Sequence, residues 1–179
     1  MRLGKIIIPG LLIFFQFVFN FLVAQPANYR TPAAEVTRMF YLQRSHNENT
    51  ISYDINVLNG KLNVEDPIHV YWIRYQENGQ KAELSFIQRK FAYGITAKKI
   101  KENYYELSFV SYKKQKLYLM PGADGKYHIY TSINKKLSIL NKIYLEIKGG
   151  TFWLPNIEYV EITGTDPATN QVVKEKIKI

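Results

Sequence analysis

Strict alternation of apolar side chains between residues 137 and 147 is the feature that most constrains the fold of this chain. The positions on one side of this run are Leu137, Ile139, Asn141, Ile143, Leu145 and Ile147. Successive side chains of a β-strand point to opposite faces, so alternation sustained over about ten residues predicts a long strand with one buried face. Such a strand needs partners, and the domain around it must be built on a sheet.

Shorter runs of the same character fill most of the remaining chain. Asn59-Gly60 predicts one tight hairpin, and the run from Pro121 to Gly125 predicts a second. The expected strands are 39–44, 51–58, 61–64, 68–75, 95–101, 104–112, 115–120, 126–133, 137–147, 151–154, 157–163 and 172–179. Their short connections leave no room for the crossover helices of a parallel sheet. We therefore predict a mainly β fold, an antiparallel β-sandwich or barrel of about ten strands with one short helix.

One segment, Lys81 to Tyr93, has helical periodicity. Leu84, Ile87 and Phe91 recur there at spacings of three and four residues. Gly94 follows directly, at the position where a C-cap glycine is common. The pattern predicts a helix that ends at Gly94.

The first residues have the layout of a secretory signal peptide. Arg2 and Lys5 precede an almost wholly apolar stretch, residues 6–23, and Ala24 then meets Gln25. A charged start, an apolar middle and a small residue before the cleavage point are the three parts of such a peptide. The sequence therefore predicts export, with a periplasmic or secreted location.

Cleavage after Ala24 would divide the chain into three parts. We expect residues 1–24 to be removed as the signal peptide, residues 25–37 to form a flexible lead-in, and residues 38–179 to form a single β-rich domain. An uncleaved membrane anchor is the alternative, because about 18 consecutive apolar residues begin to span a bilayer. After cleavage, no stable membrane span is expected.

Charge and cysteine content narrow the possible partners. The chain has a formal net charge of +9 and no cysteine. Loss of Arg2 and Lys5 with the signal peptide leaves +9 less two, that is +7. An exported basic domain meets anionic lipid, lipopolysaccharide phosphate and acidic glycans rather than nucleic acid. Without cysteine the chain has no disulfide, no thiol nucleophile and no thiolate metal site.

Much of the positive charge lies in short lysine clusters. They are Lys98, Lys99 and Lys101; Lys113, Lys114 and Lys116; Lys135 and Lys136; and Lys174, Lys176 and Lys178. Lysines at strand edges and turns are typical of solvated surfaces that prevent edge-to-edge pairing of sheets. The clusters therefore have a structural explanation beside a role in binding anions.

Signals for catalysis or metal binding are weak. His46, His69 and His128 lie far apart and lack the closely spaced ligand patterns of zinc sites. No serine has the GxSxG frame, and spacing alone does not show whether two acids face each other as glycoside hydrolysis requires. We predict no cofactor and no metal, and we keep a hydrolase acting on an envelope or glycan substrate as an alternative.

Arginine and aromatic residues supply the better candidate for a ligand site. The candidates are Arg44, Arg74, Gln88, Arg89, His69, Tyr41, Tyr71, Trp72 and Tyr93. A guanidinium matches carboxylate or phosphate and stacks on aromatic rings, so this group would suit an anionic, partly apolar ligand. The same residues also give bulk to a small β-core, and an arginine can tie a helix to a sheet through a carboxylate such as Glu83. Both interpretations stay open.

Six short segments carry a resemblance to a known family. They are Phe40 to Ser45, Pro67 to Tyr75, Ile87 to Gly94, Phe109 to Lys114, Gly150 to Pro155 and Asp166 to Thr169. In order and spacing these segments resemble an exported family of Bacteroidetes bacteria known as domain of unknown function 4833. The resemblance covers nearly all of the mature chain. It implies a periplasmic or outer-envelope location and a single compact domain, and it brings no activity or catalytic residue with it.

Together these patterns predict a non-catalytic binding or interaction module of the bacterial envelope. A carrier of an anionic, partly apolar small ligand is an alternative, with an anionic small molecule, a lipid or a glycan as its partner. A carrier needs an internal cavity into which Arg74 and Arg89 point, whereas an interaction module would show an exposed aromatic patch or an unpaired edge strand.

Overall fold

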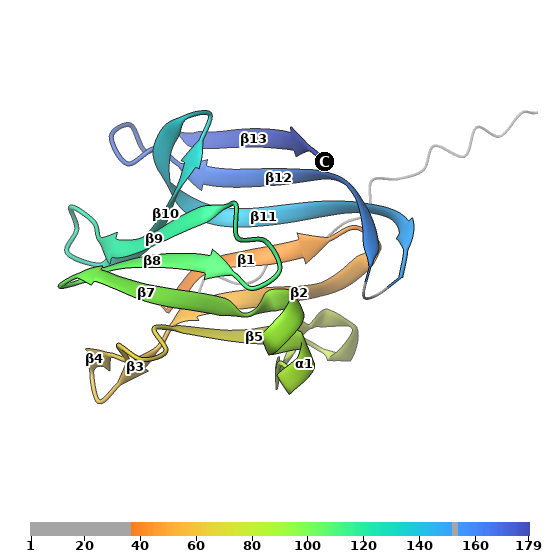
Figure 1. The fold of residues 1–179 in the computed structure, drawn as a ribbon, viewed down its shortest axis with the longest axis horizontal. Coiled ribbons are helices and arrows are strands. Elements are labelled where there is room, and N and C mark those ends of the chain that lie inside the picture. The colour runs from red at the N-terminus through yellow and green to blue at the C-terminus, as the bar shows by residue number, and fades with distance from the viewer. Residues whose placement is uncertain (1–36, 152–153) are drawn as a thin grey trace, which may run out of the picture.

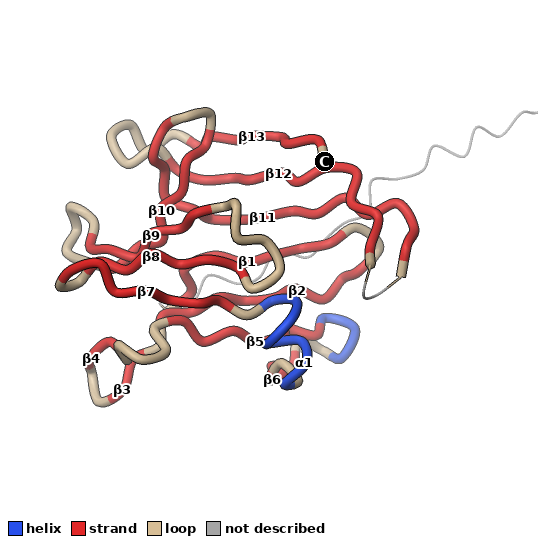
Figure 2. The backbone as a smooth tube through the Cα atoms, in the orientation of Figure 1, coloured by secondary structure: helices blue, strands red, loops and turns tan. Residues whose placement is uncertain are grey.

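The computed structural model describes residues 37–151 and 154–179, so the predicted signal peptide, and the lead-in except for Thr37, lie outside the described residues. The strands are β1 (Arg38–Arg44), β2 (Asn47–Ile55), β3 (Val57–Leu58), β4 (Lys61–Leu62), β5 (Ile68–Arg74), β6 (Gln80–Glu83), β7 (Ile95–Lys101), β8 (Tyr104–Phe109), β9 (Lys116–Pro121), β10 (Tyr127–Ile133), β11 (Lys136–Gly150), β12 (Pro155–Thr165) and β13 (Val172–Lys178). The helical elements, blue in Figure 2, are η1 (Tyr75–Glu77), α1 (Phe86–Gln88) and the π-helix η2 (Arg89–Tyr93). Within the described ranges, no helix has the length and hydropathy to cross a membrane.

Eleven of these strands form one sheet that branches at β11. β10 pairs with β11 as far as Ile139 and β1 pairs with it from Lys142 to Leu145, while β12 follows the opposite edge to Gly150. One arm therefore runs β10-β9-β8-β7 and the other β1-β2-β5-β6. Figure 1 shows the two arms as two layers that face each other. This arrangement confirms the expected sandwich-like, mainly β fold.

Three aromatic rings join the two layers in the core. Phe40 of β1 and Tyr53 of β2 stack with ring centroids 4.2 Å apart, and both rings are almost completely buried. Phe109 of β8 meets them edge-on at 6.2 and 5.9 Å. Offset stacks and edge-to-face pairs are the arrangements that aromatic quadrupoles favour. Because Phe109 comes from the other arm, this cluster fixes the two layers against each other.

Pairing is mainly antiparallel, as expected, and it is parallel at one place. β1 and β11 run parallel, with Tyr41 opposite Lys142 and Arg44 opposite Leu145. The expectation rested on short connections between consecutive strands, which force antiparallel pairing. β1 and β11 are not consecutive, and the long chain between them lets them run in the same direction.

Strong local turn signals are confirmed. Asn59 and Gly60 have φ values of 51° and 76° and join β3 to β4, which form a separate two-stranded sheet. Gly125, with φ of 73°, lies in the loop between β9 and β10. Positive φ at both central residues gives a hairpin turn the twist that suits its strands. The alternating run 137–147 is also confirmed as a strand, β11, which extends from Lys136 to Gly150. The expected single buried face is wrong at its start, because Leu137 is 48% exposed and Leu140 is buried, and the register shift after Leu140 then turns Ile143 inward.

Lysines lie on the two long strands at the ends of the sheet. β7 carries Lys98, Lys99 and Lys101, and β13 carries Lys174, Lys176 and Lys178. Charged side chains on an outermost strand hinder pairing with another chain. The position of these two lysine clusters therefore fits the structural explanation given from the sequence, that they hinder edge-to-edge pairing of sheets.

The expected helix is wrong in its first half. Lys81 and Ala82 belong to β6, which pairs with β5, and the helix begins only after Ser85. The Ser85 hydroxyl accepts a hydrogen bond from the Gln88 backbone N–H, and the Gln88 side chain accepts one from the Ser85 N–H, a capping box. Pairing with the long neighbour β5 overrides the weak helical periodicity of residues 81–84.

The end of the helix also differs from expectation. Gly94 does stop it, but its backbone is extended rather than left-handed. A side chain at this position would collide with the carbonyl oxygen of Arg89, which explains why glycine stands there. In addition, Phe86, Ile87 and Phe91 of this segment are exposed by 74%, 48% and 60%. The helix therefore turns apolar side chains toward solvent.

Candidate functional site

An apolar pocket of about 230 Å³ opens between the two layers. Its lining residues come from both arms and from the C-terminal strands: Leu42, Tyr53, Ala92, Tyr93, Phe109, Ser111, Tyr112, Gln115, Ile143, Leu145, Ile157, Val160, Ile162, Ile177 and Ile179. Nearly all of the pocket surface is aliphatic or aromatic. A cavity with such walls suits an apolar group rather than a chain of ordered waters.

The branched sheet explains where this pocket forms. β10 leaves β11 after Ile139, but β12 follows β11 onward to Gly150. Ile143 and Leu145 of β11 line the pocket, and both lie beyond the pairing with β10. Alternation along β11 turns these side chains inward, beside Leu42 of the neighbouring β1. The pocket thus occupies the region in which the two arms diverge.

Most polar side chains in the wall make internal hydrogen bonds. The Tyr53 hydroxyl donates to the Tyr93 carbonyl at 3.0 Å, and the Ser111 hydroxyl donates to the Ala92 carbonyl at 2.6 Å. The amide of Gln115 donates to the Thr131 hydroxyl at 2.6 Å. Burial raises the pKa of the Tyr53 hydroxyl, so it stays neutral. The described wall therefore presents mainly apolar surface to the space inside.

Lysines stand beside the mouth of the pocket. Lys113 and Lys114 are exposed and lie between Tyr112 and Gln115, which both line the pocket. Two lysines next to an apolar cavity can attract an anionic group while the rest of the same molecule lies inside.

Four of the predicted site residues come together beside the pocket. The guanidinium carbon of Arg44 lies 5.5 Å from the centre of the Trp72 ring and 5.6 Å from that of Tyr93. The Trp72 indole N–H donates to the Gln88 side chain at 3.4 Å. Tyr93 is the member of this group that also lines the pocket. We call these four residues, Arg44, Trp72, Gln88 and Tyr93, the Arg44 wall.

This wall affects the Tyr93 hydroxyl in two ways. Burial raises the pKa of Tyr93, and the hydrogen-bonded Arg44 guanidinium opposes that rise. Cation–π contacts with two rings hold the guanidinium in place. The arrangement fits the expectation that arginine would stack on aromatic rings, and a structural role explains it as well as ligand binding does.

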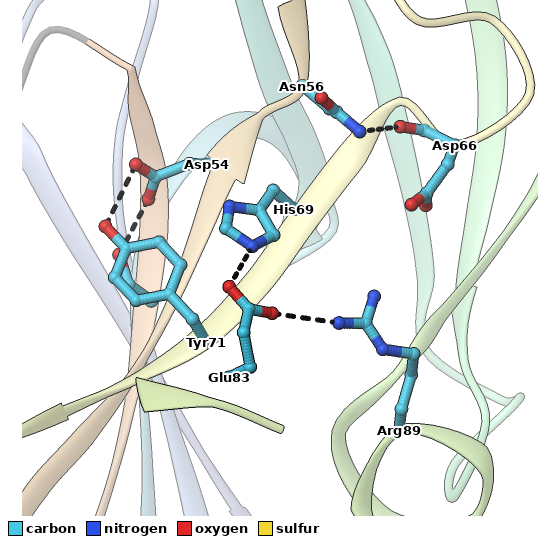
Figure 3. Close-up of polar contacts among 8 residues, drawn as sticks. Asp54, Asn56, Asp66, His69, Tyr71, Glu83 and Arg89 are labelled. Atoms are coloured by element: carbon cyan, nitrogen blue, oxygen red, sulfur yellow. Dashed lines mark hydrogen bonds and ion pairs between the residues drawn. The ribbon is translucent and has the colours of Figure 1, made fainter. Parts of the chain in front are cut away.

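Three other candidates lie near Glu83 of β6 (Figure 3): His69 and Arg89 both contact its carboxylate, and Tyr71 lies beside His69 with its hydroxyl on Asp54. The His69 Nε2 atom is 2.7 Å from one Glu83 oxygen, and the Arg89 guanidinium is 3.1 Å from the other. The rings of His69 and Tyr71 lie 5.0 Å apart. Arg89 thus ties the helix to the sheet through Glu83. None of these three candidates lines the apolar pocket.

A carboxylate beside this group, expected from the sequence only as one of several acids and not as a ligand-site residue, is buried. Asp54 is 6% exposed and accepts hydrogen bonds from the hydroxyls of Thr37, Ser52 and Tyr71 at 2.8, 2.7 and 3.1 Å. Its signal was the polar set Thr50, Ser52 and Asp54, which alternates with the apolar residues of β2. Each hydroxyl that surrounds Asp54 satisfies part of its hydrogen-bonding capacity.

The remaining candidates stand apart from both groups. Arg74 makes a surface ion pair with Glu77 at 3.1 Å, and Tyr41 lies under the Lys142 ammonium at 5.9 Å. His128 pairs with Asp124 in the β9–β10 hairpin at 3.0 Å. Over residues 37–151 and 154–179, no group of three or more histidine and acidic side chains is arranged to hold a metal ion.

Comparison with known proteins gives a family and no named relative. No curated protein and no solved structure matches the chain. One family model, described as Domain of unknown function (DUF4833), matches residues 40–176. That range runs from β1 into β13 and includes every candidate residue from Tyr41 to Tyr93 as well as most of the pocket wall. The chain therefore belongs to the family called domain of unknown function 4833.

Proposed function

We propose that this domain is a binding module for an amphiphilic small molecule, whose apolar part occupies the pocket between the layers. The anionic end of that molecule would lie at the mouth, near Lys113 and Lys114. Export to the periplasm or the cell exterior is part of the proposal and is supported by the charged and apolar residues at the start of the chain.

The apolar pocket is the observation that carries this proposal. At about 230 Å³ it exceeds the roughly 150 Å³ of an engineered apolar cavity that binds benzene. It is smaller than the roughly 300 to 1,000 Å³ that drug-sized ligands occupy. Its size therefore suits one small ring or the end of a single acyl chain, with the rest of the molecule at the mouth.

Hydrolysis is less well supported by the pocket. Among the described residues, its wall contains no histidine and no acidic side chain. The acids whose pKa values are lowered, Glu106, Asp124 and Glu158, are surface groups that face Lys116, His128 and Lys148. Cationic partners at the surface explain these shifts without a catalytic role.

Native mass spectrometry of the protein recovered from expressing cells tests the proposal first. A bound mass that disappears on denaturation supports it and identifies the ligand class. The mass of the bare chain in the same experiment shows whether residues 1–24 have been removed, because their loss changes the mass of the polypeptide.

A pocket-filling variant tests the location of binding. Ile177 is partly buried and lines the pocket from β13, so Ile177→Trp places a large side chain inside it. Val172→Trp is the matched control, since Val172 lies on the same strand and is 66% exposed. The probe is cis-parinaric acid, a fluorescent fatty acid.

Displacing about two methylenes of this probe should weaken binding about tenfold in Ile177→Trp and leave Val172→Trp unchanged. Equal binding by both variants and the wild type would place the probe outside the pocket. Failure of the folded wild type to bind the probe, together with a bare native mass, would contradict the proposed function.

A further inference from the structure

Exposed apolar side chains occur both in the lining of the pocket and on the short helix that adjoins it. We call these residues the apolar rim: Phe86, Ile87, Phe91, Tyr112 and Ile179, exposed by 74%, 48%, 60%, 47% and 64%. Tyr112 and Ile179 line the pocket itself, and Phe91 precedes Ala92, which also lines it. A hydrogen bond from Ser111 to the Ala92 carbonyl joins the helix to the loop that holds Tyr112. Large exposed apolar side chains gathered in one place mark an interaction surface.

The two segments that contain four of the five rim residues carry positive charge and no negative charge. Residues 85–94 and 110–115 contain Arg89, Lys90, Lys113 and Lys114 and no acidic residue. Arg89 pairs with Glu83, which leaves three lysines, here called the rim lysines, Lys90, Lys113 and Lys114. The Lys90 ammonium lies 5.5 Å from the Phe86 ring and 5.4 Å from the Phe91 ring. Exposed apolar side chains and positive charge therefore occur at the same place.

A second exposed apolar site shows what this combination adds. The β3–β4 hairpin, far from α1 in Figure 1, exposes Val57 and Leu58 by 45% and 58%. Its segment, residues 57–66, contains Lys61 but also Glu65 and Asp66. Exposed apolar side chains are thus present at both sites, whereas of the two only the rim has net positive charge.

We propose that the apolar rim docks on the surface of an anionic lipid bilayer, with Phe86, Ile87 and Phe91 entering the interface and the rim lysines contacting lipid phosphates. Short segments with aromatic and aliphatic side chains on one side and lysines beside them bind the boundary between headgroups and acyl chains. Each lysine held near an anionic surface contributes about as much as a fivefold change in affinity. Docking in this orientation brings the mouth of the pocket to the bilayer, although it does not depend on what the pocket binds.

Site-specific fluorescence can test this docking because the chain has no cysteine. A single cysteine is introduced by Ile87→Cys in the rim or by Leu58→Cys in the hairpin and labelled with the environment-sensitive dye NBD. Each labelled protein is titrated with phosphatidylcholine vesicles and with vesicles of phosphatidylcholine and phosphatidylglycerol. Because the dye reports its own position, the result holds whether or not residues 1–24 are retained.

The expected result is a blue-shifted, stronger emission at residue 87 with the anionic vesicles and no change at residue 58. Combining Lys90→Gln, Lys113→Gln and Lys114→Gln should weaken the binding read at residue 87 on the order of 100-fold. The matched control removes three lysines of β7 through Lys98→Gln, Lys99→Gln and Lys101→Gln, and should have much less effect. Circular dichroism confirms that each variant is folded.

Three outcomes would overturn the proposal. Equal emission changes at residues 58 and 87 would show non-specific adsorption, and no change at residue 87 would show that the rim stays in water. A change at residue 87 that follows protein concentration without vesicles would assign the rim to contact between two copies of the chain. Failure of pocket binding alone would leave the docking result unaffected.

Discussion

The outer face of β2, β5 and β6 and the pocket between the layers use side chains in opposite ways. On the outer face, the Asp54 carboxylate and the Glu83 carboxylate both have hydrogen-bond or ion-pair partners within the chain. In the pocket, apolar surface is left without a partner among the residues that the structure describes. The first region contains more residues capable of chemistry, and yet their groups already satisfy one another. In this molecule, apolar surface left uncovered by the described residues is therefore a better indication of a ligand site than the presence of reactive residue types.

Removing the buried carboxylate should have the largest effect on stability. Asp54→Ala leaves the hydroxyls of Thr37, Ser52 and Tyr71 without their shared acceptor, and we expect a loss of about 3 kcal/mol. Urea unfolding followed by circular dichroism measures it. Asp66→Asn, at an exposed position, is the control and should change stability by less than about 0.5 kcal/mol. Similar values for the two variants would mean that the outer face is not held together by Asp54.

The Arg44 wall should contribute less, because its contacts can be replaced in part. Arg44→Met keeps an apolar stem between Trp72 and Tyr93 but removes the cation over both rings, for an expected loss of about 1 kcal/mol. The same urea measurement applies. Arg74→Met removes an exposed arginine and serves as the control. If Arg44→Met also abolishes probe binding in a folded protein, the wall acts on the ligand as well as on stability.

Filling the pocket should change stability little. Ile177→Trp adds bulk where space is open, so we expect a change within about 1 kcal/mol of the wild type, below the roughly 1 to 3 kcal/mol that overpacking a dense core costs. Thermal unfolding with Val172→Trp as reference is the measurement. A much larger loss would show that the pocket collapses in solution and that its wall is packed like the rest of the core.

Titration of the β9–β10 hairpin should give the smallest effect. A hydrogen bond with His128 and the backbone N–H of Lys126 lower the pKa of Asp124. A lowered folded-state pKa gives stability that is present above the unfolded pKa of aspartate and is lost as the pH falls through the folded pKa. His128→Gln should bring the Asp124 pKa, read by carboxyl NMR shifts, closer to its ordinary value. An unchanged pKa would assign the shift to the backbone alone.

Local signals in the sequence predicted the elements that local chemistry determines. The alternation of 137–147 and the turn at Asn59-Gly60 each depend on neighbours in the chain, and both are confirmed. Residues 81–83 were predicted as helix because they precede the helical spacing of Leu84, Ile87 and Phe91, but pairing with β5 decides their structure. The parallel contact of β1 with β11 joins residues about a hundred positions apart, for which a single sequence gives no signal.

Of the candidate site, only the cluster around Arg44 was predictable from the sequence, and the pocket was not. Arg44, Trp72, Gln88 and Tyr93 were expected to gather, and they do, because the alternation of β1 and β5 and the short helix turn them toward one another. The pocket was not predicted, since its walls come from strands whose relative position depends on the branching of the sheet. The available signal was the apolar set Ile157, Val160 and Ile162, together with Ile177.

Branching at β11 has a consequence for the order in which the chain folds. Each arm consists of strands that are neighbours in sequence, so each can assemble from local hairpins as the chain emerges. β1 nevertheless needs Lys142 to Leu145 to cover its second edge, and this pairing closes a loop of about a hundred residues. In a chain that folds from its N-terminus, the arm β1-β2-β5-β6 therefore has an unpaired edge at β1 until β11 is available. Because this pairing spans the longest separation along the chain, we expect the joining of the two arms to be slower than the formation of either arm.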